Sequence, residues 1–197
     1  MGVVDSLISF WHNKIEQQRI IMYTDQPGWY HAEGDPLDTM RFWTGSEWNE
    51  EVLGGNTIGP RLGAKVIDAL IIGFTALIIG AIFFGTTEIT YSILVLHLIL
   101  SGIYEIAFLT LKGATPGKIL LGFRVVQSSN GKSPPAASSA RNRFLPNLVA
   151  LIPFVGWLFN FAIIGISLYW LSADFNRQSI FDRSGKTFVV RIPRESS

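Results

Sequence analysis

An almost uninterrupted apolar stretch from Val66 to Phe84 constrains this chain more than any other feature. Asp68 is its one charged residue, and most of the other side chains are aliphatic or aromatic. A helix rises about 1.5 Å per residue, so roughly 20 apolar residues cross the hydrocarbon core of a bilayer. The stretch therefore predicts a transmembrane helix.

Three charged residues mark the start of this helix. Lys65 and Asp68 follow Arg61 by four and seven residues, which places all three near one helical face. A carboxylate about one turn inside hydrocarbon costs a few kcal/mol unless it is paired or hydrated. We therefore expect a buried charge cluster at this end of the helix.

A second apolar stretch, Ile89 to Leu111, predicts another span with polar residues inside it. His97, Ser101 and Glu105 follow one another at steps of four residues, so they lie along one side of a helix. Polar groups within a membrane helix usually face protein or water. Either they bond to a neighbouring helix and hold the bundle together, which we favour, or they line a proton or cation path.

The last apolar stretch, Phe144 to Leu171, is interrupted by Pro146, Pro153 and Gly156. A single crossing would place the basic residues of the following tail outside, against the positive-inside rule. A broken helical hairpin that bends near Pro153 and returns to the cytoplasm fits the charges better. The expected fold class is mainly α: a small polytopic helical membrane bundle of two full spans plus a third span or a broken hairpin.

Basic residues predict the orientation. The segment 112–143 holds six Lys or Arg and no acid, so it should be cytoplasmic. The predicted crossings then place the N-terminus, and with the hairpin the C-terminus, on the same side of a bacterial plasma membrane. Four side chains of this segment are expected to contact anionic headgroups or a partner: Lys118, Arg124, Arg141 and Arg143.

Two shorter patterns lie in the same segment. Gly113 to Lys118 is similar to a phosphate-binding loop, but it lacks the full spacing and the Ser or Thr after the lysine. Nucleotide binding is therefore not expected. Ile119 to Val126 alternates too poorly for a soluble strand, and we expect it to lie on the lipid headgroups.

The residues before the first span predict separate units. Residues 1–24 are amphipathic, which indicates a helix that lies on a membrane surface or packs on its own domain. Residues 25–53 form a tryptophan-rich segment with frequent turns. Residues 54–60 are rich in glycine and predict a flexible joint to the membrane part.

The tryptophan-rich segment predicts a small β module at the front of the bundle. Trp29, Trp43 and Trp48 either form the core of this module, which we favour, or expose a binding platform. Turn residues separate three expected strands: Gly28–His31, Thr39–Trp43 and Glu47–Val52.

Several functional classes are excluded or not expected. Cysteine is absent, which excludes disulfides, thiolate catalysis and cysteine metal sites. The histidines, His12, His31 and His97, are too scattered to predict a metal cluster. No nucleophile, base and orienting group form a recognisable set, so we expect no enzymatic activity and no cofactor. We also expect no nucleic-acid partner.

Three ordered motifs make residues 61–191 resemble the RDD family of small integral membrane proteins. The family is named for one arginine and two aspartates. The resemblance implies that Arg61 and Asp68 are the arginine and the first aspartate, and that Asp182 is the second, with Asp174 as the alternative. Phe181 stands where a histidine commonly precedes that aspartate. The motifs are Arg61–Asp68, Gly113–Val126 and Asp174–Val190.

The ends of the chain lie outside this resemblance. Residues 192–197 are a short tail. The front resembles the short tryptophan-rich domain, of unknown function, of many actinobacterial membrane proteins. That likeness rests on Pro27–Tyr30 and Arg41–Trp48.

Two functions follow as expectations. The RDD family has no established common activity, and cation–proton exchange has been suggested for some members. We expect a non-enzymatic accessory or assembly subunit of a larger membrane complex, which docks through its tryptophan-rich and basic surfaces. The alternative is a small cation or proton transporter, acting as an oligomer through Arg61, Asp68, Glu105 and Asp182. We expect Arg61, Asp68 and Asp182 to form one charge-paired cluster at the cytoplasmic boundary.

Overall fold

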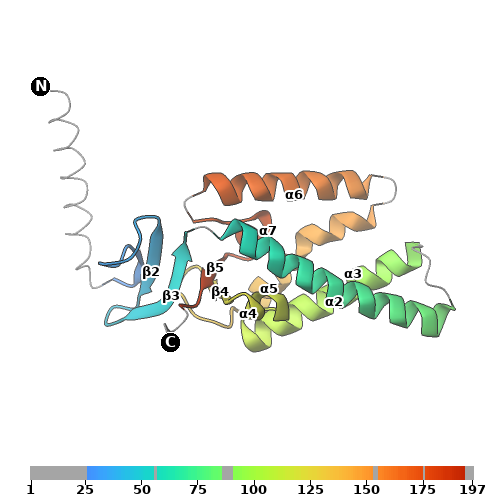
Figure 1. The fold of residues 1–197 in the computed structure, drawn as a ribbon, viewed down its shortest axis with the longest axis horizontal. Coiled ribbons are helices and arrows are strands. Elements are labelled where there is room, and N and C mark those ends of the chain that lie inside the picture. Colours follow the sequence, from blue (N-terminus) through green and yellow to red (C-terminus); the bar gives the residue numbers. More distant parts are fainter. Residues whose placement is uncertain (1–25, 56, 86–90, 153–154, 175, 194–197) are drawn as a thin grey trace, which may run out of the picture.

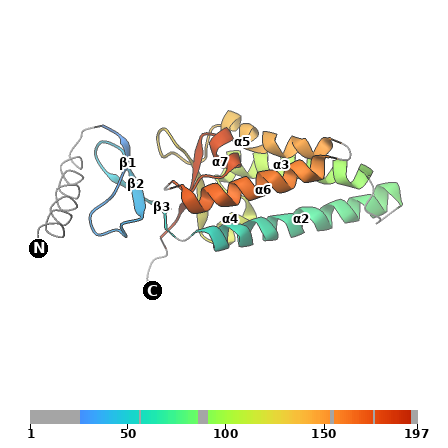
Figure 2. The ribbon, with the colours of Figure 1, turned by 90° about the horizontal axis from the view of Figure 1, so that it is seen from above.

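The computed structural model describes residues 26–55, 57–85, 91–152, 155–174 and 176–193. A β-sheet lies at one end of an elongated molecule, and long helices extend from it (Figure 1 and Figure 2). The expected helix at 1–24 and most of the 192–197 tail fall outside the described residues. The elements in chain order are β1 (Gly28–Tyr30), β2 (Thr39–Trp43), β3 (Trp48–Gly54), α2 (Ile58–Phe84), α3 (Tyr91–Lys112), α4 (Pro116–Leu120), β4 (Phe123–Gln127), α5 (Ala137–Phe144), η1 (Leu145–Leu151), α6 (Gly156–Ala173), α7 (Ile180–Ser184) and β5 (Thr187–Arg191).

Helices α2 and α3 correspond to the two predicted spans. Among the described residues, these two helices are long and apolar enough to cross a membrane, with mean hydropathies of 2.5 and 2.0. Only 17% and 22% of their most apolar windows are buried within the chain. Their apolar side chains therefore face outward, which suits helices surrounded by lipid rather than the core helices of a soluble protein. The predicted mainly helical fold is confirmed.

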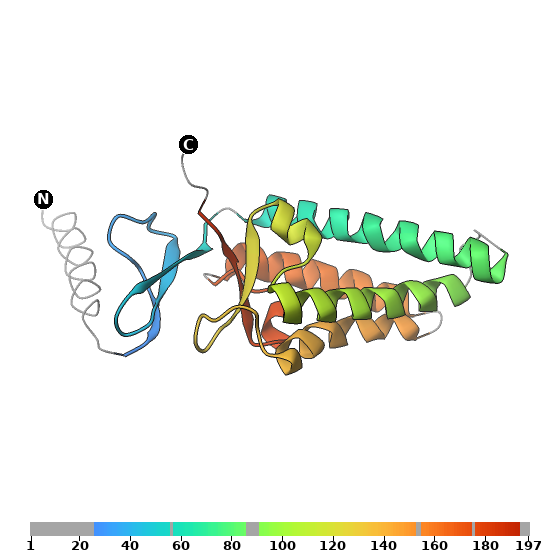
Figure 3. The ribbon, with the colours of Figure 1, turned by 90° about the horizontal axis from the view of Figure 1, so that it is seen from below.

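The last apolar stretch forms the broken hairpin. η1 continues from α5, the chain reverses between Ile152 and Gly156, and α6 runs back toward the sheet beside η1 (Figure 3). Gly156 permits the close reversal, because a Cβ there would lie 2.7 Å from the carbonyl oxygen of Val149. Of the two alternatives for this stretch, the structure has the hairpin.

The sheet has five strands in the order β1-β2-β3-β5-β4, and every neighbouring pair is antiparallel. The first three strands agree closely with the predicted ones. The prediction for Ile119–Val126 was wrong in part, because Phe123–Gln127 is strand β4 and not a segment on the headgroups. Its poor alternation has a physical cause: both faces of β4 are covered, so Phe123, Val125 and Val126 are all buried.

Two apolar cores lie on the two faces of this sheet. Side chains that alternate along β4 and β5 belong to opposite clusters, as the pleat of a strand requires. The face toward α3 and α5 carries Leu109, Phe123, Val125, Ala140 and Val189. The opposite face carries Leu53, Val126, Phe188 and Val190, with Trp29 and Met40 packed against them.

Trp29 joins the front strands to the rest of the chain. Its ring packs edge-on against Phe42 and Phe188, with centroids 5.4 and 5.2 Å apart. Its Nε1 donates to the carbonyl oxygen of Ser128 at 2.8 Å. Trp43 and Trp48 instead pack on each other at 5.1 Å and stay half-buried. Trp29 therefore has the core role that we favoured.

The glycine-rich joint is shorter than predicted. Strand β3 extends to Gly54 and α2 begins at Ile58, so few residues separate sheet and helix. Strand β3 also pairs with β5 from the C-terminal part, with Val52 opposite Arg191. The tryptophan-rich strands are thus continuous with the sheet of the membrane part.

Replacing the shared tryptophan tests this continuity. We expect Trp29→Ala to lower the free energy of unfolding by roughly 3 kcal/mol, because it removes an aromatic side chain from between two rings and leaves a cavity. The measurement is unfolding of the full chain in mild detergent. Leu37→Ala is the matched control, because Leu37 is 83% exposed and its loss should change stability little. Equal melting of both variants and the wild type would contradict a shared core.

Candidate functional site: a charged pocket beside the sheet

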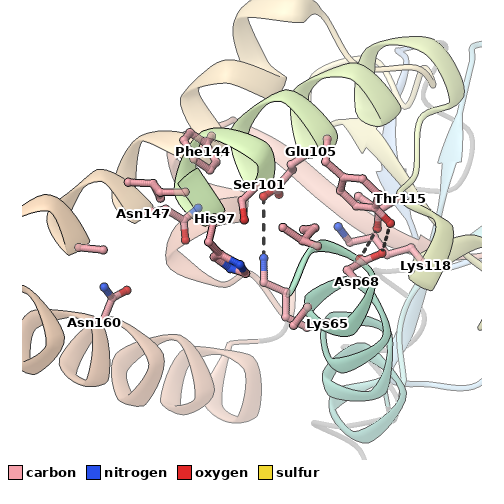
Figure 4. Close-up of a pocket in the computed structure, with 15 residues that line it drawn as sticks. Lys65, Asp68, His97, Ser101, Glu105, Thr115, Lys118, Phe144, Asn147 and Asn160 are labelled. Atoms are coloured by element: carbon pink, nitrogen blue, oxygen red, sulfur yellow. Dashed lines mark hydrogen bonds and ion pairs between the residues drawn. The ribbon is translucent and has the colours of Figure 1, made fainter. Parts of the chain in front are cut away.

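Charged and polar side chains meet where the long helices reach the sheet. Two adjoining cavities of about 250 and 380 Å³ lie there and share Lys65, Asp68, Glu105 and Lys118 in their walls. The walls come from α2, α3, α4, η1 and α6 (Figure 4). Among the described residues, no three His, Asp or Glu side chains lie close enough together to hold a metal ion.

Asp68 is buried without a cationic ion-pair partner in the described part of the chain. Its carboxylate accepts hydrogen bonds from the Tyr104 hydroxyl at 2.8 Å, the Thr115 hydroxyl at 2.6 Å and the backbone N–H of Gly117 at 2.8 Å. Three donors stabilise the charge in place of a cation, and one of them belongs to the first turn of α4.

The segment Gly113–Lys118 therefore surrounds an internal anion. Pro116 lies at the first turn of α4, where its missing N–H costs nothing. Gly117 allows α4 to approach α2, since a Cβ there would lie 2.3 Å from the Ala64 carbonyl oxygen and 2.8 Å from Asp68 Oδ1. The likeness to a phosphate loop reflects related chemistry, because the Gly117 N–H and the Thr115 hydroxyl donate to an anion, the Asp68 carboxylate.

Asp182 is the second buried carboxylate, with 1% of the residue exposed. Arg143 donates to its Oδ1, and Arg61 Nη1 lies 3.5 Å from its Oδ2. Ser179 and Asp182 form a capping box at the start of α7, with the Ser179 N–H 2.9 Å from Oδ2. Burial raises the pKa of Asp182, but Arg143, Arg61 and the Ser179 N–H together hold it below its ordinary value.

The two arginines make further hydrogen bonds besides those to Asp182, but not all of their N–H groups have an acceptor in the described part of the chain. Arg61 donates to the carbonyl oxygens of Arg177 and Val189, each at 2.6 Å, and Arg143 donates to the Thr187 hydroxyl. The Nε atoms of both Arg61 and Arg143 are buried and have no hydrogen-bond partner among the described residues. Arg143 was expected at the headgroups, but its side chain is almost fully buried against Asp182, which leaves no surface contact for it.

Glu105 is the third buried acid. Lys65 Nζ lies 3.8 Å from its Oε2, although the Lys65 side chain is 61% exposed. Lys118 lines both cavities and has no ion pair within the described residues. Burial, Arg143 and Lys65 lower the pKa of Lys118, Glu105 and Asp68 raise it, and the net pKa is about 8.

His97 and Ser101 continue the polar lining along α3 from Glu105 (Figure 4). Asn147 of η1 and Asn160 of α6 line the same cavity. In the described part of the chain, no hydrogen bond joins the His97 or Ser101 side chain to a neighbouring helix. The favoured prediction for these two residues was a bond between helices, and the structure places them at a cavity instead.

The other predicted site residues lie elsewhere. Asp174 pairs with Arg183 at 2.9 Å, Arg124 pairs with Glu51 at 2.9 Å, and Arg141 is exposed. The single cluster expected of Arg61, Asp68 and Asp182 is divided, because Arg61 pairs with Asp182 while hydroxyl and backbone donors surround Asp68.

The family comparison adds to this geometry. A profile of the RDD family matches residues 56–186, which is more than half of the chain and includes Arg61, Asp68 and Asp182. The chain belongs to the RDD family. No curated protein and no solved structure matches it. The match begins after the tryptophan-rich strands, so the likeness of that segment to an actinobacterial domain stays a prediction.

Sequence reasoning missed most partners of the two aspartates in this RDD protein. Tyr104, Thr115 and Gly117 were not predicted to contact Asp68. Two local signals could have found part of the arrangement. Ser179 three residues before Asp182 is a capping-box pattern, and Thr115 before Pro116 is typical of a helix start.

A double-mutant cycle tests whether Arg143 and Asp182 act as a pair. Each single change, Arg143→Met or Asp182→Leu, should cost about 3–5 kcal/mol, because the remaining charge stays buried without its partner. The double variant should cost much less than the sum. The measurement is the free energy of unfolding in detergent, or the yield of folded protein where a variant is too unstable to melt.

Arg61→Gln with Asp68→Asn is the matched control cycle. These two residues share no partner, so their effects should add within about 0.5 kcal/mol. Rescue of Asp68→Asn by Arg61→Gln would contradict the divided arrangement and restore the single cluster.

Proposed function

We propose that this RDD protein exchanges protons for a small monovalent cation at the charged pocket. The observation that carries the proposal is the position of Lys118, which lines one cavity together with the carboxylates of Asp68 and Glu105 and has no ion pair of its own in the described residues. A proton on Lys118 and a cation in the cavity would compete for the same two carboxylates.

The charges support such a competition. Lys65 and protonated Lys118 balance the charges of Asp68 and Glu105, so these four side chains have no net charge while Lys118 holds its proton. Loss of the Lys118 proton leaves the cavity with one net negative charge, and a monovalent cation can neutralise it. Since the pKa of Lys118 lies at about 8, this change falls near physiological pH. One cation would enter for each proton that leaves.

The polar lining supports a route toward the membrane interior. Glu105, Ser101 and His97 follow one side of α3 over about 12 Å, from the sheet end toward the far end. Two spans and a hairpin do not enclose a complete path, so we propose that the protein acts as an oligomer whose other copies supply the remaining wall.

An accessory role ranks second. It rested on a separate tryptophan-rich module and a flexible joint, whereas β3 is part of one sheet with β4 and β5. The transport measurement below includes the outcome that would favour this role.

We also propose that the sheet end of the molecule is cytoplasmic. The start of α2, the ends of α3 and α6 and the sheet lie together at one end (Figure 1), and the basic segment 112–143 belongs to that end. The chain has no cysteine, so single-cysteine variants report position without background. In intact cells an impermeant maleimide should label Tyr91→Cys at the far end and should reach Ser129→Cys only after permeabilisation. The reverse pattern would contradict this orientation.

Flux in liposomes tests the exchange. In proteoliposomes that hold only this chain, an outward-directed proton gradient should drive sodium uptake. The rate of uptake should rise as the pH passes about 8. Lys118→Arg should be slow at every pH, since an arginine keeps its proton. In Lys118→Met the rate should no longer rise as the pH passes about 8. Lys112→Met, an exposed lysine at the end of α3, should behave like the wild type.

Folded protein that gives no saturable flux would overturn the exchange proposal. Silent liposomes together with a defined membrane partner that co-purifies from native membrane would favour the accessory role. An unchanged pH step in both Lys118 variants would show that Lys118 is not the competing group.

A further inference from the structure

A groove between α2 and α6 opens from the charged pocket along the outside of the bundle. α2 packs mainly on α3 and α4, and α6 packs mainly on η1; the two helices contact each other only slightly, and residues of both line the cavity of about 380 Å³. The two helices are close at the sheet end and diverge away from it (Figure 1). The groove thus has an entrance from the side of the molecule that faces lipid.

The end of the groove beside the sheet has an excess of positive charge. The groove walls include four basic and three acidic side chains. One of the acids, Asp182, pairs with both Arg61 and Arg143. Within the described part of the chain, the Nε atoms of Arg61 and Arg143 remain buried donors without acceptors. Lys65 reaches this end from α2 and lies 5.8 Å from the Phe181 ring centroid. Unsatisfied donors beside surplus positive charge match an anionic oxygen.

The walls farther from the sheet are apolar. Val66 of α2 is 58% exposed and Ile164 of α6 is 47% exposed, and both line the groove. Leu62 and Leu168 extend the same two walls. One end of the groove therefore suits a phosphate, and its length suits hydrocarbon.

We propose that an anionic phospholipid of the cytoplasmic leaflet occupies this groove, with its phosphate beside Lys65 and Arg61 and an acyl chain between Val66 and Ile164. A helix of a second copy would fill the apolar part but would leave the buried arginine donors without acceptors. A phospholipid suits both ends, because its phosphate supplies acceptors and its acyl chain supplies hydrocarbon. This inference goes beyond the proposed exchange, because the lipid site is measured without any ion flux.

Lipid binding to the full chain tests the proposal. Protein freed of lipid in mild detergent is incubated with phosphatidylglycerol or phosphatidylcholine of identical acyl chains, and bound lipid is counted by native mass spectrometry. We expect one phosphatidylglycerol to bind in preference to phosphatidylcholine. Lys65→Gln should weaken it roughly fivefold, the effect of one basic residue beside an anionic lipid. Ile164→Trp should weaken both lipids, because the ring occupies the acyl position.

Lys112→Gln is the matched control, since Lys112 is an exposed lysine at the same end of the molecule and lies outside the groove. It should bind like the wild type. Equal binding of the two lipids, or equal losses in Lys65→Gln and Lys112→Gln, would overturn the site. Disulfide-linked dimers of Val66→Cys formed in native membrane would overturn it in favour of a second copy.

Discussion

Asp182 is a carboxylate with almost no exposure to solvent, and the way it is neutralised determines how the segments of this protein meet. Arg61 approaches it from α2, Arg143 from α5 and the Ser179 N–H from the start of α7. Arg143 also donates to Thr187 at the start of β5. A buried carboxylate is tolerated only while such partners remain in place, so the position of each segment depends on the others.

Asp68 solves the same physical problem without a cation. Its partners are two hydroxyls and one backbone N–H, and they come from α3 and from the first turn of α4. Asp68 thus accepts from the start of a short helix in another segment, α4, whereas Asp182 lies in the first turn of its own short helix, α7. Among the described residues neither Lys65 nor Lys118 forms an ion pair with Asp68, and Lys65 pairs with Glu105 instead.

The sequence predicted the helical part well, because apolar length and prolines are local signals. The two long apolar helices and the reversal before Gly156 were predicted from these signals, and the first three strands from turn residues. Strands β4 and β5 escaped, since both of their faces are buried and their residues do not alternate. The single charge cluster was also expected for a good reason, helical spacing from Arg61 to Asp68. Spacing describes one helix, however, and the partners of Asp68 come from α3 and from the start of α4, which lie 36 to 49 residues away in the sequence.

The strand order determines when the sheet can form during synthesis of the protein. Strand β5 lies between β3 and β4, yet it is the last strand of the five to be synthesised. Until Thr187–Arg191 leaves the ribosome, β3 and β4 have no common neighbour, and Val126 and Leu53 have no core to join. The helices form from segments made earlier, whereas the sheet must wait for β5. Its open strand edges are therefore exposed to other proteins for most of that time.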